Sequence, residues 1–137
     1  MHNIRAAIAT DEGTTCITRH FGDARYYDLY DVNQSGVHFV GRLENTVDVE
    51  ENEESHGDIK KASGIGSLLK QQRVNTAVSK VFGPNIKRLI KNYACVIVSE
   101  DSITKVLEML AREQSRLCDA LDAGEERSVL DLRKISS

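Results

Sequence analysis

The chain has 137 residues, a usual size for one domain, and folding at that size buries roughly two-thirds of the surface that the unfolded chain exposes. Hydrophobic residues make up 40% and charged residues 28%, which excludes a collagen-like chain, a disulfide scaffold and intrinsic disorder. The net charge of -3 combines two unlike segments: residues 44–54 hold six acidic residues and no basic one, whereas residues 59–99 hold eight Lys or Arg and no Asp or Glu. The second segment is therefore expected to attract anions.

The N-terminus and the cysteines indicate the cellular compartment. Residues 1–5 lead into a short apolar stretch without the core or cleavage site of a signal peptide, and no apolar run approaches the ~18 residues of a membrane helix. The cysteines Cys16, Cys95 and Cys118 are odd in number and widely spaced, with no CxxC pair. We therefore expect a cytoplasmic protein without disulfides that does not associate with a membrane.

Hydrophobic patterns in the first third of the chain predict four strands, over residues 4–10, 14–19, 25–32 and 37–43. The first strand ends at the turn Asp11-Glu12-Gly13, and the third and fourth flank Asn33-Gln34-Ser35-Gly36. These turn residues favour a hairpin. The acidic residues that follow, up to about Ser55, are predicted to form a solvated loop.

From residue 57 onward, helical and β-prone patterns alternate: a helix over 57–72, a strand over 74–81, a second helix that opens at Phe82-Gly83-Pro84, a strand over 93–99 and a third helix to about 123. Proline fits the first turn of the second helix. Ser99, Asp101 or Ser102 can cap the third helix. Residues 128–132 form a weak strand-like piece whose position the pattern does not determine.

This order predicts a single α/β domain with a mixed sheet, in which antiparallel strands come first and parallel strands joined by helical crossovers follow. The strand over 93–99 is the most continuously apolar and is expected near the centre of the sheet, covered on both faces. We place the domain at residues 1–123 and a C-terminal extension at residues 124–137.

Six short motifs follow one another along the chain: the acidic-glycine turn within 7–13, His20-Phe21-Gly22, the aromatic run 27–31, His56-Gly57, Phe82-Gly83-Pro84-Asn85 and the apolar run 94–98. In this order and spacing, residues 4–112 resemble the dinitrogenase iron-molybdenum cofactor biosynthesis family, also called nitrogenase accessory factor or NifX-like. The chain departs from that family in its acidic loop 44–54, in Ser79-Lys80-Val81, where glycines are common, and in its tail after about 112.

The resemblance implies a ribonuclease H-like fold without nuclease activity. It also implies a carrier that binds an anionic metal cluster, namely the iron-molybdenum cofactor or an iron-sulfur precursor, and that exchanges it with a cofactor-donating or cofactor-accepting protein. Such a protein is not expected to be an enzyme. We expect a monomer or a homodimer, and we do not expect nucleic acid as a partner.

His20 is the first candidate metal ligand, because a neutral imidazole beside a glycine at a strand connection can bind a metal or a cluster iron. A hydrogen-bonded loop histidine would show the same sequence. The resemblance adds support for the ligand role, because the matching histidine of cofactor-binding relatives is implicated in ligand contact, and both interpretations stay open. Cys16, four residues upstream, and His56, at the start of the first helix, are further candidates. Their alternatives are a small buried hydrophobic residue and an exposed histidine.

A second set of candidates suits the negative charge of such a cofactor. Gly83 and Asn85 lie where a helix start presents unpaired N–H groups, Lys80 and Lys87 flank them, and Gly22 belongs to the same tripeptide as His20. The alternative is a tight strand-to-helix turn with solvated lysines.

Two other classes of function remain open. A metal-dependent nuclease needs clustered carboxylates, and Asp11, Asp28 and Asp31 lie near strand ends, although Asp28 and Asp31 should face opposite sides of their strand. A regulatory or protein-interaction module without metal would dock through the last helix, with Leu117, Cys118 and Leu121 as its exposed residues.

Overall fold

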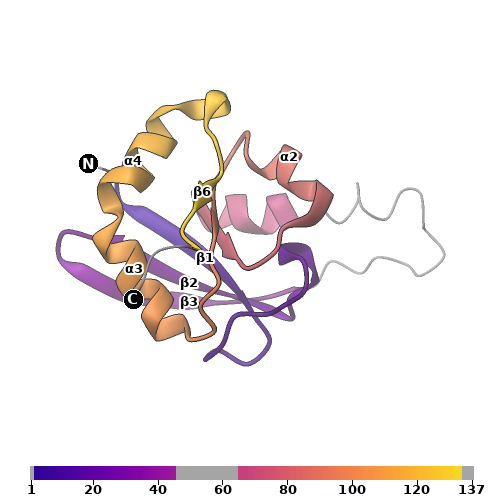
Figure 1. Ribbon diagram of the computed structural model, residues 1–137. Coiled ribbons are helices and arrows are strands. Elements are labelled where there is room, and N and C mark those ends of the chain that lie inside the picture. The colour runs from indigo at the N-terminus through magenta and orange to yellow at the C-terminus, as the bar shows by residue number, and fades with distance from the viewer. Residues whose placement is uncertain (1, 46–64, 134–137) are drawn as a thin grey trace.

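The computed structural model describes residues 2–45 and 65–133, except the side chain of Asn85. One sheet of six strands has the order β3-β2-β1-β4-β5-β6 (Figure 1). The strands are β1 (Ile4–Thr10), β2 (Tyr26–Asn33), β3 (Gly36–Glu44), β4 (Thr76–Ser79), β5 (Ala94–Ile97) and β6 (Leu130–Asp131). β1, β2 and β3 pair antiparallel, whereas β1, β4, β5 and β6 pair parallel. The predicted α/β domain with a mixed sheet is therefore confirmed.

Helices cover both faces of this sheet: α2 (Ile86–Leu89), α3 (Ile103–Arg112), α4 (Gln114–Asp122) and the helical residues 65–71. Short 3-10 turns lie at η1 (Phe21–Asp23), η2 (Gly83–Asn85) and η3 (Gly124–Glu126). Within the part of the chain described above, no helix combines the length and apolar character needed to cross a bilayer.

The two faces of the sheet form two separate hydrophobic clusters. On one face, Leu110 of α3 and Leu117 of α4 pack with Ile8. On the other, Leu69 and Leu89 pack with residues such as Ala7. Figure 1 shows α3 and α4 on one side of the sheet and α2 on the other. Successive residues of β1 enter opposite clusters because side chains alternate along a strand.

The predicted hairpin is present, and its turn follows the expected residues. The Ser35 N–H donates to the Asn33 side-chain oxygen at 2.9 Å, and Gly36 has a φ of +121°. The β-prone run over 74–81 gives a shorter strand, since β4 has four residues.

Residues 14–19 were predicted to be a strand, and this prediction is wrong. They form only isolated bridges, from Thr15 to Ser102 and from Cys16 to Thr10. The Thr14 and Thr15 N–H groups donate instead to the Glu12 carboxylate, at 2.9 and 2.7 Å. A side chain thus replaces the neighbouring strand as their acceptor.

The last predicted helix is divided in two. Glu113, with φ of -102° and ψ of 22°, separates α3 from α4. This break lets α3 pack on β2 and β3 while α4 packs on β1 and β5. Beyond α4, β6 pairs with β5, and Leu132 is fully buried. The strand-like piece over 128–132 therefore completes the edge of the sheet, although the boundary placed at 123 stays a prediction.

Candidate functional site

His20 lies on the connection between β1 and β2, beside the carboxyl end of β4. It forms a parallel bridge with Val81, whose carbonyl accepts from the Phe21 N–H at 2.8 Å. The exposed imidazole packs on Gly83, where an added Cβ would lie 2.6 Å from His20 Nδ1 and 2.7 Å from Cε1. Gly83 also has a φ of +70°, a conformation that glycine adopts most readily. Two predicted binding residues are thus in contact, and the contact requires a residue without a side chain at position 83.

An aromatic stack beneath the surface holds these two residues together. Phe21 follows His20, Phe82 precedes Gly83, and their rings stack with centroids 5.3 Å apart. Phe21 also packs on Tyr27, at 4.9 Å, and its carbonyl accepts from the Tyr27 hydroxyl at 2.9 Å. All three rings are buried. Because Phe21 and Phe82 are the neighbours of His20 and Gly83 in the chain, their stacked rings fix the position of these two residues relative to each other.

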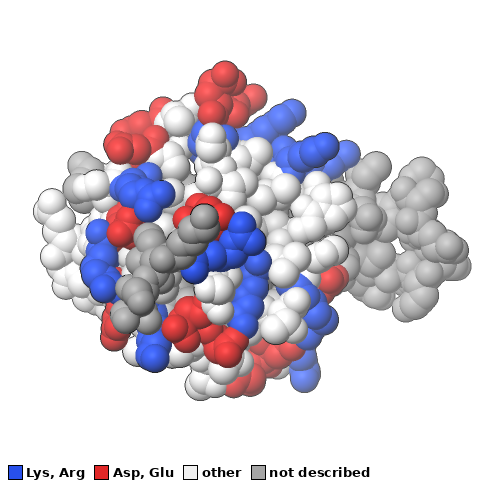
Figure 2. Space-filling view, in the orientation of Figure 1, with Lys and Arg blue, Asp and Glu red and all other residues white. Residues whose placement is uncertain are grey.

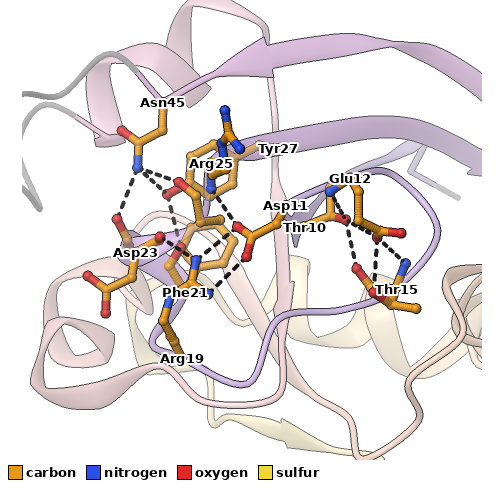
Figure 3. Close-up of polar contacts among 12 residues, drawn as sticks. Thr10, Asp11, Glu12, Thr15, Arg19, Phe21, Asp23, Arg25, Tyr27 and Asn45 are labelled. Atoms are coloured by element: carbon orange, nitrogen blue, oxygen red, sulfur yellow. Dashed lines mark hydrogen bonds and ion pairs between the residues drawn. The ribbon is translucent and has the colours of Figure 1, made fainter.

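A carboxylate clamp fixes the same connection from the other side. Asp11 accepts from both terminal nitrogens of Arg19, at 2.9 and 2.8 Å, and from the Arg25 N–H at 3.0 Å (Figure 3). Arg19 also donates to the Asp23 carbonyl at 3.0 Å. The hydrogen bond from Arg19 is the main reason why the pKa of Asp11 lies below its ordinary value. The residues on either side of His20 are thereby tied to the end of β1.

Glu12 organises the turn that precedes this clamp. Its carboxylate accepts from the Thr15 hydroxyl at 2.9 Å and from the Thr14 hydroxyl, besides the two N–H groups described above. These bonds, first the one from the Thr14 hydroxyl, lower the pKa of Glu12 to about 2 from its ordinary value of 4.5. These bonds depend on the charged form of Glu12 because the carboxylate is the acceptor in each of them.

The substitution Glu12→Gln tests this dependence. Since the pKa is lower in the folded chain, ionised Glu12 stabilises the fold above pH 4.5, and this contribution disappears as the pH falls towards about 2. The parent should therefore be more stable than Glu12→Gln at neutral pH, with a difference that shrinks across this window. Urea unfolding followed by circular dichroism measures it, with Glu108→Gln, on the exposed surface of α3, as the control. A pH-independent difference would contradict the assignment.

Cys16 has the surroundings of a core residue. Its side chain is 6% exposed and belongs to the cluster beneath α3 and α4, whereas His20 lies on the surface. Burial raises the pKa of the Cys16 thiol to about 11, so the thiol is protonated at neutral pH. Because metals bind the thiolate, this environment disfavours the predicted ligand role of Cys16, which stays a prediction.

The basic residues predicted around Gly83 are not equivalent. Lys80 is 16% exposed and forms a salt bridge with Asp101, so its charge is already compensated. Lys87 lies exposed on α2. The second helix, predicted to open at Phe82-Gly83-Pro84, is present as a 3-10 turn followed by the four residues of α2. Because it is so short, the positive end of its helix dipole contributes little here. The anion-binding argument therefore depends on side-chain charge.

Of the remaining predicted site residues, the structure describes backbone atoms alone or no atoms at all. Gly22 is buried in η1, and its carbonyl accepts from the Asn45 amide at 3.1 Å. Asn85 has its backbone in η2, but its side chain lies outside the described residues, as does the whole of His56. Their predicted roles stay predictions.

The carboxylates considered for a nuclease lie apart, each bonded to its own arginine. Asp28 accepts from Arg42 at 2.7 Å, Asp31 from Arg5 at 2.8 Å, and Asp11 belongs to the clamp with Arg19. No group of three metal-binding side chains occurs among the residues described in this structure. The geometry thus lacks the carboxylate cluster that two-metal chemistry requires.

The exposed surface expected on the last helix is absent. Leu117 is fully buried and Cys118 is 7% exposed, while Leu121 packs partly buried against the same cluster. That prediction is wrong because the bend at Glu113 turns the apolar side of α4 onto β1 and β5. These residues stabilise the fold and offer no docking surface.

Sequence reasoning missed the Asp11–Arg19 clamp. The two residues are eight positions apart and follow no helical or strand period. The one available signal was an acidic residue at the end of an apolar strand and an arginine immediately before His20. Only the path of the connection shows that they meet.

Comparison with known proteins gives one family. The family model described as dinitrogenase iron-molybdenum cofactor matches residues 2–115. A crystal structure of a protein provisionally described as a dinitrogenase, from Methanocaldococcus jannaschii, is similar with a TM-score of 0.59 and 21% identity over 83% of this chain and 93% of that one. An NMR structure so described, from Methanococcus jannaschii, has a TM-score of 0.56 and 20% identity over 83% and 92%. At sequence identities this low, the similarity to these two structures shows a shared fold alone. Among curated proteins, none matches this chain.

Proposed function

Because the chain belongs to the dinitrogenase iron-molybdenum cofactor family, we propose that it binds an anionic metal cluster through His20. The cargo is the iron-molybdenum cofactor or an iron-sulfur precursor. The observation that carries this proposal is the exposed imidazole held against the backbone of Gly83. Since Gly83 lies against Nδ1 and Cε1, Nε2 is the ring nitrogen left to bind an iron.

His20, as a single protein ligand, suits a preassembled cluster better than a bare metal ion. A bare transition-metal ion is usually held by three or four protein ligands. No such group exists among residues 2–45 and 65–133. A cluster arrives with its own inorganic ligands, so one imidazole and nearby positive charge can suffice. Lys87, exposed on α2, supplies that charge, and α2 has no acidic residue in its first turn.

The proposed role is transport rather than catalysis. A carrier must release its cargo, and a single surface ligand allows release to an acceptor protein more easily than a closed cage. The ribonuclease H-like fold, which the family resemblance implies, belongs to this proposal and is supported by three antiparallel strands followed by parallel β4 and β5. A cytoplasmic location is likewise proposed.

Anaerobic loading tests the proposal. The parent, His20→Ala and His38→Ala are incubated with an iron-sulfur cluster or extracted iron-molybdenum cofactor, separated from excess, and examined by absorbance and metal analysis. His38 is an exposed histidine of β3 and serves as the matched control. We expect stoichiometric metal in the parent and in His38→Ala and loss of most metal in His20→Ala. Equal metal in His20→Ala and the parent, or none in the parent, would overturn the proposal.

A further inference from the structure

A cavity of about 510 Å³ lies at the opposite end of the parallel strands from His20. Its wall includes Val74, just before β4, and Tyr93, just before β5, whereas His20 bridges to Val81 beyond the carboxyl end of β4. The four residues of β4 alone separate the two places by roughly 13 Å. The Tyr93 hydroxyl donates to the Gly66 carbonyl at 3.0 Å and so ties the helical residues 65–71 to the base of β5.

The described polar residues that line this cavity are all basic or neutral. They include Lys70, Arg73 and Arg88 together with Ser67 and Asn92, and no carboxylate of residues 2–45 or 65–133 lines it. In the described ranges, no salt bridge joins the three cations to an acidic side chain, although Arg5, Arg19 and Arg42 each form one. The sequence supports this charge pattern because residues 59–99 contain no Asp or Glu. Figure 2 shows Lys and Arg side chains gathered over α2.

Arg73 has a backbone conformation that an arginine rarely adopts. Its φ is +60°, and the Arg73 N–H donates to the Lys70 carbonyl at 3.0 Å, which ends the helix. Glycine or asparagine usually occupies such a position, and a larger residue there costs about 1 kcal/mol. A strained residue whose side chain lines a cavity points to a role for that side chain.

Positive charge at a helix C-terminus is stabilising without any ligand. That effect explains one cation at the end of each of the two helices, residues 65–71 and α2. It does not explain why an open cavity lies between these cations or why one of them is an arginine with a strained backbone. The cavity volume falls within the range of small-molecule sites, and arginine forks match oxyanions in two-point contacts.

We propose that this cavity binds a small molecule bearing a polyvalent oxyanion group, either phosphate or several carboxylates, through Lys70, Arg73 and Arg88. Val74 and Leu89 form an apolar part of the wall for the body of such a ligand. The site is separate from His20, so it does not depend on the cluster-binding proposal.

Titration calorimetry at constant ionic strength tests the site with inorganic pyrophosphate and with citrate as probes. Arg73→Gly should weaken binding at least tenfold while leaving the urea midpoint unchanged or raised, because glycine relieves the backbone strain. This combination separates a binding role from a structural one. Arg88→Gln should weaken binding similarly.

Lys91→Ala removes an exposed charge next to the cavity that does not line it, and His20→Ala removes the other site; both should bind as the parent does. The probe that binds with the higher affinity shows whether the site recognises phosphate or carboxylate groups. Absence of binding for both probes in the parent, or equal affinity in Arg73→Gly, Arg88→Gln and Lys91→Ala, would overturn the proposal.

Discussion

Replacing Phe21 with alanine is expected to lower the free energy of unfolding by about 3–5 kcal/mol, a large part of the ~5–15 kcal/mol of an ordinary domain. Phe21 is 1% exposed, stacks on Phe82 and packs against the tilted ring of Tyr27. Alanine would remove both aromatic contacts and leave a cavity under His20. The variant should therefore also bind the cluster less well, because the support of the imidazole is lost.

Urea unfolding followed by circular dichroism measures this cost, since the chain contains no tryptophan to report by fluorescence. Phe39→Ala is the matched control: Phe39 is 59% exposed on β3, and its loss should cost less than about 1 kcal/mol. Phe21→Leu keeps most of the volume and is expected to lie between the two. Similar costs for Phe21→Ala and Phe39→Ala would show that the stack does not support the fold.

Gly83→Ala is expected to reduce cluster binding at least tenfold although His20 itself is unchanged. The added methyl group would lie 2.6–2.9 Å from three ring atoms of His20, closer than a carbon contact allows. Because the imidazole is exposed, we expect the ring to rotate away rather than the chain to unfold. Anaerobic loading followed by metal analysis measures the loss. Parent-like metal content would contradict the role of the His20–Gly83 contact.

Gly124→Ala provides the control for backbone strain. Gly124 has a φ of +62°, close to the +70° of Gly83, but nothing lies within 4 Å of its added Cβ. Both variants should lose about 1–2 kcal/mol of stability from the left-handed backbone, and only Gly83→Ala should lose cluster binding. In a His20→Ala background the clash disappears, so any cost of Gly83→Ala beyond that of Gly124→Ala should disappear too.

Apolar periodicity determined much of the architecture from sequence alone. The strands at 4–10 and 25–32, the hairpin turn at 33–36 and the buried run at 93–99 were predictable because strand alternation and turn chemistry are local properties. The change from antiparallel to parallel pairing also followed, since a hairpin joins neighbouring strands directly and helical crossovers return the chain in the same direction. His20 and Gly83 stood out for the same local reason, each beside a turn.

Tertiary structure decided the features that depend on distant partners. Sequence showed glycine at position 83 as part of a turn, but only the fold shows that its missing side chain admits the His20 ring. The burial of Cys16, the bend at Glu113 and the clamp of Asp11 on Arg19 all result from packing between segments far apart in sequence or without a shared period. The basic cavity likewise required the fold, because Lys70, Arg73 and Arg88 belong to two segments that meet only at the amino ends of β4 and β5. Periodicity specifies which side chains are buried, whereas the contacts between elements specify what they touch.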